Sequence, residues 1–432
     1  MSAAGADVEL EGLAAADAPK LVTPVPGPEA MARVERDRRV TSPSLPRAYP
    51  FVPRRGAGSV LEDVDGNLFL DLNAGIAVTS TGHCHPRIVE AVQRQAAELL
   101  HYSASDFYLP IYADVCARLD EMAPFSRPAR SFLTNSGTEA VEAAIKLARY
   151  ATGRQYLIGF LQSFHGRSMG SVTLTASKAL YRTNFGPMLP SVYHAVYGDF
   201  EYLEEVVFKR LVSPTEVAAI IVETYVGEGG YLLPPDGWFS SLRELCDRHG
   251  ILLVCDEVQS GMGRTGSMWA IEREGVEPDI VLAGKGIASG LPLGAMLARE
   301  DLMRWELGAH GSTYGGSPVP CAAALATFDV IGDEDLLDNA TSVGEVFLSG
   351  LRDMQARYPG IIEVRGVGLW IGVQFADHAA AEAVELAAFR RGLLMLTCGD
   401  DAIRISPPLV FREDQAKTSL EILEEAVAEA IG

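Results

Sequence analysis

The sequence predicts an α/β protein, with a large domain built around a mostly parallel central sheet and a smaller α+β domain beside it. Between about residues 128 and 298, short aliphatic runs alternate with segments of helical periodicity, as in parallel strands joined by crossover helices. After about residue 329 the pattern changes to helix, strands and helix. The chain has 432 residues, of which 48% are hydrophobic, so it can bury more than one core.

We expect four segments along the chain. Residues 1–28 are rich in Ala, Pro, Gly and acids without any period, which predicts a loose N-terminal arm. Residues 29–74 are assigned to the N-terminal part of the small domain and residues 75–328 to the large domain. Residues 329–432 complete the small domain.

Charge and composition exclude several classes of function. The net charge of -21 argues against nucleic acid and anionic membrane surfaces as partners, because both select for basic patches. No apolar run approaches the about 18 residues of a membrane span. The six cysteines are scattered, and the first twenty residues are acidic, unlike the start of a signal peptide. We therefore expect a cytoplasmic protein.

Individual elements follow in order. An Asp-Gly turn at 65–66 between apolar runs predicts a hairpin over 60–72, and residues 86–100 have helical spacing. A helix is expected over 237–248, with Asp236 as its N-cap and Gly250 beyond its end. The remaining candidate strands are 131–134, 156–160, 218–222, 251–255, 280–284 and 293–297.

Two of these strands each run into an ionisable residue. The strand at 251–255 leads to Asp256, and the strand at 280–284 leads to Lys285. Because ligands bind at the carboxyl ends of parallel strands, we expect both side chains in one cleft. The pair suits pyridoxal phosphate, which a lysine holds as a Schiff base while an acid pairs with the pyridine nitrogen.

Three further segments place polar groups at the same edge. Residues 135–139, Asn-Ser-Gly-Thr-Glu, open a helix after a strand and predict a phosphate site, with an ordinary helix cap as the alternative. Residues 164–167, Phe-His-Gly-Arg, offer a ring that can stack and a cation that can bind a carboxylate. Glu223 ends a strand, and Glu228 lies in a glycine-rich turn.

Other motif matches carry less weight. Residues 261–266 fit G-x-G-x-x-G, but five residues separate them from the strand, unlike a dinucleotide site. Residues 166–170 fit G-x-S-x-G, but 171–175 predict a strand where a nucleophile elbow needs a helix. His83, Cys84 and His85 cannot all face one ion in regular structure, so we expect a turn and no metal.

Taken together, the motifs resemble the class III aminotransferases, the family of 4-aminobutyrate, ornithine and acetylornithine aminotransferases. The match runs from about residue 41 to the C-terminus, and its 4-aminobutyrate-like branch is favoured by Cys398-Gly399-Asp400 before 403–408. The motifs lie at 63–66, 75–78, 81–83, 135–140, 164–167, 256–261, 263–266, 284–286 and 310–316. The resemblance implies a fold-type I pyridoxal phosphate enzyme that acts as a homodimer with shared active sites, a tetramer remaining open.

The resemblance also implies roles for individual residues. Lys285 would form the Schiff base and move the proton, Asp256 would hold the pyridine nitrogen, Phe164 would stack on the ring, and Gln259 would reach its phenolic oxygen. Arg167 would bind the carboxylate of an ω-amino acid, and Arg404 that of glutamate or 2-oxoglutarate, pairing with Glu228 otherwise. The implied cofactor-binding residues are Ser136, Gly137, Thr138, Phe164, His165, Glu223, Asp256, Val258, Gln259, Lys285 and, from the neighbouring subunit, Thr313. The implied substrate-binding residues are Ile76, Arg167, Glu228 and Arg404.

These roles predict transfer of an amino group from an ω-amino acid such as 4-aminobutyrate to 2-oxoglutarate. Two departures from the family pattern leave the substrate open: Thr224 stands where a proline is usual, and residues 286–290 are less glycine-rich than expected. An amino-acid racemase, which uses the same lysine but returns the proton to the opposite face of the α-carbon, is the main alternative. A catalytically silent pyridoxal phosphate-binding protein is the other.

Overall fold

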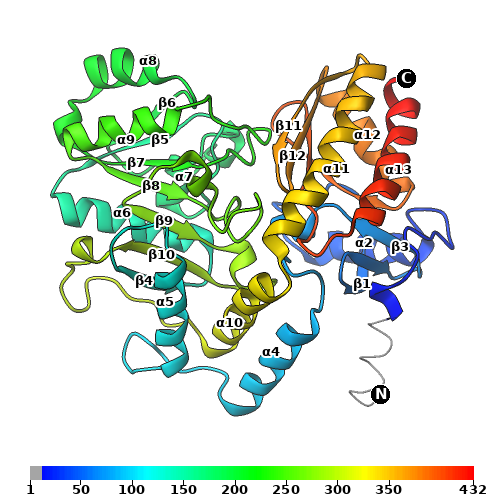
Figure 1. Cartoon of the computed structure of the whole chain (residues 1–432), viewed down its shortest axis with the longest axis horizontal. Coiled ribbons are helices and arrows are strands. Elements are labelled where there is room, and N and C mark those ends of the chain that lie inside the picture. The colour runs from blue at the N-terminus through cyan, green and yellow to red at the C-terminus, as the bar shows by residue number, and fades with distance from the viewer. Residues whose placement is uncertain (1–11) are drawn as a thin grey trace.

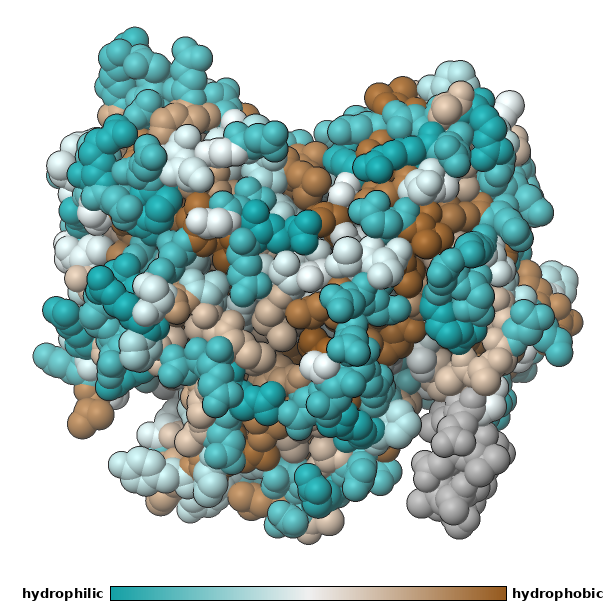
Figure 2. Space-filling view, in the orientation of Figure 1, coloured by the Kyte–Doolittle hydropathy of each residue, from teal (hydrophilic) through white to brown (hydrophobic). Residues whose placement is uncertain are grey.

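The computed structural model describes residues 12–432, which form two lobes (Figure 1). The chain passes from the large lobe to the small lobe between α10 (Pro318–Asp333) and α11 (Leu336–Arg357). The surface is notched between the two lobes at the upper edge of Figure 2. Of the predicted N-terminal arm, residues 1–11 lie outside the described part of the chain.

A seven-stranded sheet forms the centre of the large lobe, in the order β4-β10-β9-β8-β7-β5-β6. The strands are β4 (Ala129–Thr134), β5 (Tyr156–Phe160), β6 (Val192–Ala195), β7 (Val217–Glu223), β8 (Leu252–Asp256), β9 (Ile280–Ala283) and β10 (Gly294–Arg299). The pairs from β9 through to β6 are parallel, whereas β10 is antiparallel to both β4 and β9. The predicted α/β class with a mostly parallel sheet is confirmed.

Both faces of this sheet are buried, which explains the uninterrupted apolar runs of its strands. Successive residues of β8 belong to different clusters: Leu252 and Val254 pack with α6 (Gly137–Thr152), and Leu253 and Cys255 pack with α9 (Trp238–His249). The other helices of this lobe are α4 (Pro86–Glu98), α5 (Pro110–Met122), α7 (Met169–Leu174) and the short α8 (Phe200–Tyr202). The sheet is thus held between helical layers.

The small lobe contains two four-stranded sheets and three long helices. One sheet has the order β1-β2-β3-β13 and the other β11-β12-β15-β14. The strands are β1 (Pro53–Ala57), β2 (Val60–Asp63), β3 (Leu68–Asp71), β11 (Ile361–Val367), β12 (Trp370–Phe375), β13 (Leu393–Leu394), β14 (Leu396–Cys398) and β15 (Ala402–Ile405). The helices are α11, α12 (His378–Arg390) and α13 (Glu413–Ile431), which pack against one another, with α2 (Pro28–Val40) nearer the N-terminus.

The predicted hairpin is β2 and β3. The Asp63 carboxylate accepts the amides of Asp65 and Asn67, and Gly66 adopts a φ of 87°, so the turn needs both residue types. Where the sequence predicts a loose arm, the described residues are anchored, because the Asn67 side chain accepts the amides of Val22 and Thr23.

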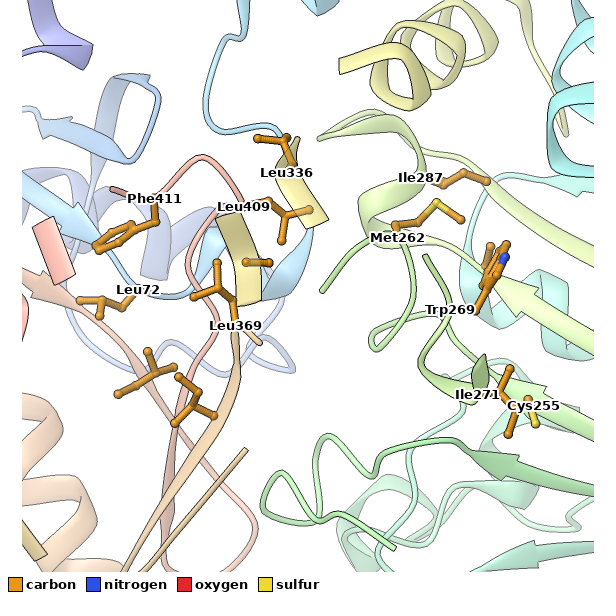
Figure 3. Packing of buried hydrophobic residues seen from close by; sticks show 14 of the residues in the cluster. Leu72, Cys255, Met262, Trp269, Ile271, Ile287, Leu336, Leu369, Leu409 and Phe411 are labelled. Carbon is orange, nitrogen blue, oxygen red and sulfur yellow. The ribbon is translucent and has the colours of Figure 1, made fainter. Parts of the chain in front are cut away.

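One apolar cluster spans both lobes. It includes Leu72 and Phe411 of the small lobe together with Met262 and Trp269 of the large lobe (Figure 3). Arg264 crosses the same boundary fully buried, and its guanidinium donates to the carbonyls of Leu369 and Pro407. The glycine-rich loop 261–266 therefore joins the lobes.

Two local predictions were wrong. Residues 169–174 form the helix α7, although 171–175 predicted a strand from their β-branched residues; the Thr173 hydroxyl instead bonds the Met169 carbonyl within the helix. Gly237, with a φ of 74°, stands at the N-cap of α9 where Asp236 was expected, and no side chain caps this helix. Gly250 ends it as predicted, in the left-handed conformation.

Candidate active site

Three neighbouring strands bring ionisable residues to one edge of the large sheet. Glu223 and Asp256, the last residues of β7 and β8, lie opposite each other in register. Lys285 follows β9, the next strand, after Gly284. Arg404 comes from β15 of the small lobe, so this edge faces the boundary between the lobes.

The Asp256 carboxylate is held from both sides. One oxygen lies 2.7 Å from Nδ1 of His165, which is completely buried, and the other accepts the Val258 amide at 3.1 Å. Burial alone would lower the pKa of His165, but its hydrogen bond to Asp256 and the charge of that residue leave the pKa raised. The imidazole therefore favours its charged form beside Asp256.

Both carboxylate oxygens of Glu223 are used to hold loops of the protein. Its oxygens accept the amides of Phe164, at 2.7 Å, and Gly227, at 3.0 Å. Burial raises the pKa of Glu223 to about 7. The charge of His165 lowers this pKa, and the charge of Asp256 raises it. Glu223 thus fixes the segment before Arg167 and the turn that carries Glu228.

The segment 135–139 opens α6 as predicted. Ser136 is the N-cap, and its hydroxyl accepts the Glu139 amide at 3.4 Å, while Glu139 accepts the Asn135 amide at 2.7 Å. The amides of the first helical turn have no intrahelical acceptor and point out of the helix end. The Thr138 hydroxyl is engaged within the protein, since it is hydrogen-bonded to the hydroxyls of Ser168 and Ser171.

Close packing joins this helix end to the lysine. A Cβ at Gly137 would lie 2.6 Å from Val258, and a Cβ at Gly284 would lie 3.4 Å from the Gly137 Cα. Only glycine at 137 therefore lets the helix end, the loop after Asp256 and the segment before Lys285 meet.

The buried Arg404 forms an ion pair with the partly buried Glu228 beside Lys285. Their Oε1 and Nη1 atoms are 2.8 Å apart, and Arg404 is only 4% exposed. Burial would lower the pKa of Arg404, but the charge of Glu228 raises it; burial would raise the pKa of Glu228, but Arg404 lowers it. Burial, assisted by Arg404 against the opposing charge of Glu228, lowers the pKa of Lys285 to about 8.

Arg167 lies at the exposed mouth of this region. Its guanidinium is 4.4 Å from the ring centroid of Tyr181 and 5.9 Å from that of Phe164. Desolvation raises the pKa of Tyr181, and the charges of Glu228, Arg167 and Arg404 all act on it. The predicted carboxylate-binding arginines thus approach one tyrosine from two lobes.

Ile76 occupies a strained segment. The four residues of α3 (Ala74–Ala77) all have positive φ, between 50° and 71°, so this turn is left-handed. The Asp71 carboxylate holds it through the amides of Asn73 and Ala74 and also contacts His83 at 2.7 Å. Ile76 is 39% exposed as a result.

Thr313 is exposed and lies in the loop before α10. Nothing in the contacts of the described residues brings it to Lys285, so its expected role depends on a second subunit.

The two departures from the family pattern have structural explanations. The Thr224 hydroxyl donates to the buried Glu257 at 2.7 Å, a bond that proline could not make. Ser289 lies 2.9 Å from the Thr81 hydroxyl, which ties the segment after Lys285 to the segment after α3. Both substitutions add a hydrogen bond near the site.

The weaker motifs serve structural roles. Ser168 precedes a helix, as a nucleophile elbow requires, so the predicted strand does not exclude a hydrolase serine. The contacts and the backbone conformation of Ser168 exclude it instead. Its hydroxyl bonds Glu142 and Thr138, and its φ of -70° is unstrained. His83 and His85 contact Asp71 and Glu334 respectively. Within residues 12–432, no group of three His, Cys, Asp or Glu side chains could hold a metal ion.

Sequence reasoning missed Tyr231. It is completely buried, and its hydroxyl donates to Oε1 of Gln259 at 3.1 Å. It follows a glycine pair in an irregular segment, so neither helical nor strand periodicity marks it.

These residues fit pyridoxal phosphate. A fixed carboxylate, Asp256, lies in the same site as Lys285, whose lowered pKa favours the reactive amine. The helix end at Gly137 is shaped for an anion, and close packing links it to both groups. Nε2 of His165 is buried without a partner among the described residues, while Nδ1 is held by Asp256.

Comparisons with known proteins agree with this site. Residues 43–427 match the family model described as aminotransferase class-III. An alanine/serine racemase from Pyrococcus horikoshii is 35% identical, over 96% of this chain and 93% of the relative. A 4-aminobutyrate aminotransferase from Mycobacterium tuberculosis is 36% identical, over 94% and 97%. An acetylornithine aminotransferase from Methanopyrus kandleri is 42% identical, over 88% and 95%.

A solved structure supports the fold as well. The ornithine aminotransferase from Toxoplasma gondii ME49 aligns with a TM-score of 0.87 and 31% identity, covering 93% of this chain and 95% of that one. The family prediction and the cofactor prediction are confirmed: the chain belongs to the class III aminotransferases and is a pyridoxal phosphate-dependent enzyme.

Proposed function

We propose that this enzyme moves an amino group from an ω-amino acid, with 4-aminobutyrate as the first candidate, to 2-oxoglutarate. The observation that supports the proposal most is the ion pair of Glu228 and Arg404 beside Lys285. An ω-amino acid carries its only carboxylate far from the amino group, whereas glutamate carries a second one next to it. A pocket that serves both must offer an arginine to one substrate and conceal it from the other.

Glu228 can conceal Arg404 without leaving a buried charge unpaired. An arginine at 4% exposure without a partner would be strongly unfavourable, so a carboxylate must replace Glu228 when the pair opens. The α-carboxylate of glutamate or 2-oxoglutarate supplies that charge. Arg167, at the exposed mouth, is left to bind the distal carboxylate of an ω-amino acid.

The remaining residues divide the chemistry. Bound pyridoxal phosphate supplies a ring that accepts electrons from the substrate carbon that carries the amino group. Asp256, hydrogen-bonded to His165, would pair with the pyridine nitrogen. Lys285 holds and releases a proton at Nζ, and its pKa of about 8 suits that task near neutral pH. Ser136 and Gly137 present the helix end to the phosphate, and Gln259 reaches for the phenolic oxygen.

A racemase is the second candidate, supported by the 35% identity with the alanine/serine racemase over 96% of this chain. The two activities differ in where the proton returns, to the cofactor or to the opposite face of the α-carbon. Incubating the enzyme with single enantiomers of alanine, serine and glutamate, with and without 2-oxoglutarate, separates them. Inversion in the absence of any keto acid would favour the racemase, and dependence on the keto acid would favour the transferase.

We also propose a homodimer in which Thr313 of one subunit contributes to the other's phosphate site. Several large exposed apolar side chains support this assembly, because contact with a second subunit would remove them from water. Tyr108 and Leu307 are fully exposed, Phe107 is half exposed, and Tyr314 packs on His101 near the same loop. Sedimentation of the purified enzyme tests it, and a monomer that retains full activity would refute the shared site.

The location of the enzyme stays a proposal. None of the helices within residues 12–432 combines the length and apolar content needed to cross a bilayer. We propose the cytoplasm from the scattered, free cysteines, five of which are buried or partly buried. Fractionation of the native cells checks this assignment.

A further inference from the structure

Tyr231 has a costly conformation that the small lobe maintains. Its φ is 55°, a region that aromatic residues rarely adopt. Its ring stacks on Trp370 of β12, with centroids 3.9 Å apart and planes at 4°. Arg365 donates to the carbonyls of Gly230 and Tyr231, and a Cβ at Gly372 would lie 2.9 Å from the Tyr231 Cβ. The surrounding contacts therefore determine where the phenol points.

The hydroxyl of Tyr231 ends on Gln259. It donates to Oε1 at 3.1 Å, while Nε2 lies against the backbone of Gly227, where a Cβ would be only 2.1 Å away. The Gln259 amide is thus confined at both of its polar atoms. Its plane has little freedom, and glycine is required at 227.

The direction of this hydrogen bond follows from the surroundings. Burial raises the pKa of Tyr231 to about 12, while Arg404 and Ser406 act in the opposite direction, so the phenol keeps its proton at neutral pH. The neighbouring Arg404 can only donate hydrogen bonds. Gln259 Oε1 therefore accepts the hydrogen bond of the phenol at 3.1 Å, and the Ser406 hydroxyl also acts on the phenol.

We propose that Tyr231 is a positioning residue that sets the orientation of the Gln259 amide. With Oε1 engaged by Tyr231, the N–H donors of the amide are left for the phenolic oxygen of the cofactor. The reversed amide would turn its own oxygen toward that negative atom. This inference deepens the proposed role of Gln259 and does not depend on which amino acid is the substrate.

The test uses the complete holoenzyme and measures the cofactor without any substrate. Tyr231→Phe keeps the ring on Trp370 but removes the hydroxyl. We expect pyridoxal phosphate to dissociate about threefold to tenfold faster, as expected for the loss of one hydrogen bond, and the visible absorption band of the bound cofactor to move. Tyr225→Phe is the matched control, because this buried tyrosine also lies near Trp370 but donates to Glu274.

A double-mutant cycle separates positioning from a general effect on packing. In the Gln259→Leu background, Tyr231→Phe should change neither the dissociation rate nor the band further, because Tyr231 acts through Gln259. An unchanged holoenzyme in Tyr231→Phe would overturn the inference. An equal change in both backgrounds would also overturn it, since it would show a role independent of the amide.

The result is separate from that of the proposed reaction. If no ω-amino acid reacts but the cycle is non-additive, the substrate proposal fails and the positioning role stands. If Gln259→Leu alone leaves the cofactor band unchanged, Gln259 does not contact the cofactor and the inference fails, whatever the substrate.

Discussion

The surroundings of Lys285 make its amine more reactive at neutral pH than that of an ordinary lysine. Its pKa is lowered to about 8 by burial and by Arg404. Only an uncharged amine attacks the aldehyde of pyridoxal phosphate. Since each pKa unit is a factor of ten, the uncharged form is about 300-fold more populated at pH 7 than for a lysine with an ordinary pKa.

The sign of the pH dependence follows directly. Lys285 loses its proton as the pH rises through about 8. Well above that pH nearly all of the amine is uncharged, so a further rise in pH adds no more reactive amine. We expect the rate of pyridoxal phosphate uptake by the apoprotein to rise about tenfold per pH unit below about pH 8 and to level off above about pH 9. Stopped-flow absorbance measures this rate, with free Nα-acetyl-lysine as the reference amine. A rate that still rises about tenfold per unit at about pH 9, as expected for a lysine with an ordinary pKa, would refute the reasoning.

Glu228→Gln extends the test. The charge of Glu228 raises the pKa of Lys285, so its removal should move the plateau to lower pH. Glu274→Gln is the control, because this carboxylate contacts Tyr225 and does not act on Lys285. A plateau that moves equally in both variants would show that the charge of Glu228 does not set the pKa of Lys285.

Three further predictions concern substrate, cofactor and assembly. Arg404→Ala should slow the glutamate half-reaction about 10-fold to 100-fold more than the 4-aminobutyrate half-reaction, as expected for the loss of one charge-assisted hydrogen bond. Single-turnover absorbance measures both half-reactions. Equal losses would contradict the proposal that Arg404 serves only one of the two substrates. Gly137→Ala should weaken pyridoxal phosphate binding, because its Cβ would lie 2.6 Å from Val258. Gly332→Ala should leave the binding unchanged, because there is open space around that position. Equilibrium dialysis measures both affinities, and equal affinities would contradict the packing argument. Tyr108→Asp should shift the enzyme toward monomer in sedimentation and lower its cofactor content, and an unchanged assembly would place the interface elsewhere.

The part of the site that lies at strand ends could be predicted from the sequence. Asp256 and Lys285 each follow an uninterrupted apolar run, and buried parallel strands place their carboxyl ends at one edge. Ser136 was equally visible, since a small polar residue before a helical pattern marks an N-cap. In each case local pattern and global fold favour the same structure.

Residues that depend on contacts between distant segments could not be predicted in this way. Tyr231 acquires its position from Trp370 and Arg365, more than a hundred residues away. The side chain of Thr138 belongs to the cluster with Ser171, which nothing in the helix pattern indicates. Burial also overrode propensity at residues 171–174, where β-branched residues form part of a helix.

The fate of the amino group tests the central claim most directly. Enzyme loaded with pyridoxal phosphate is mixed with 4-aminobutyrate in the absence of any keto acid, and the visible absorption is followed through a single turnover. We predict conversion of the cofactor to its amine form, and restoration of the original band with production of glutamate when 2-oxoglutarate is added. A band that no ω-amino acid converts, together with inversion of alanine or serine in the same buffer, would contradict the claim.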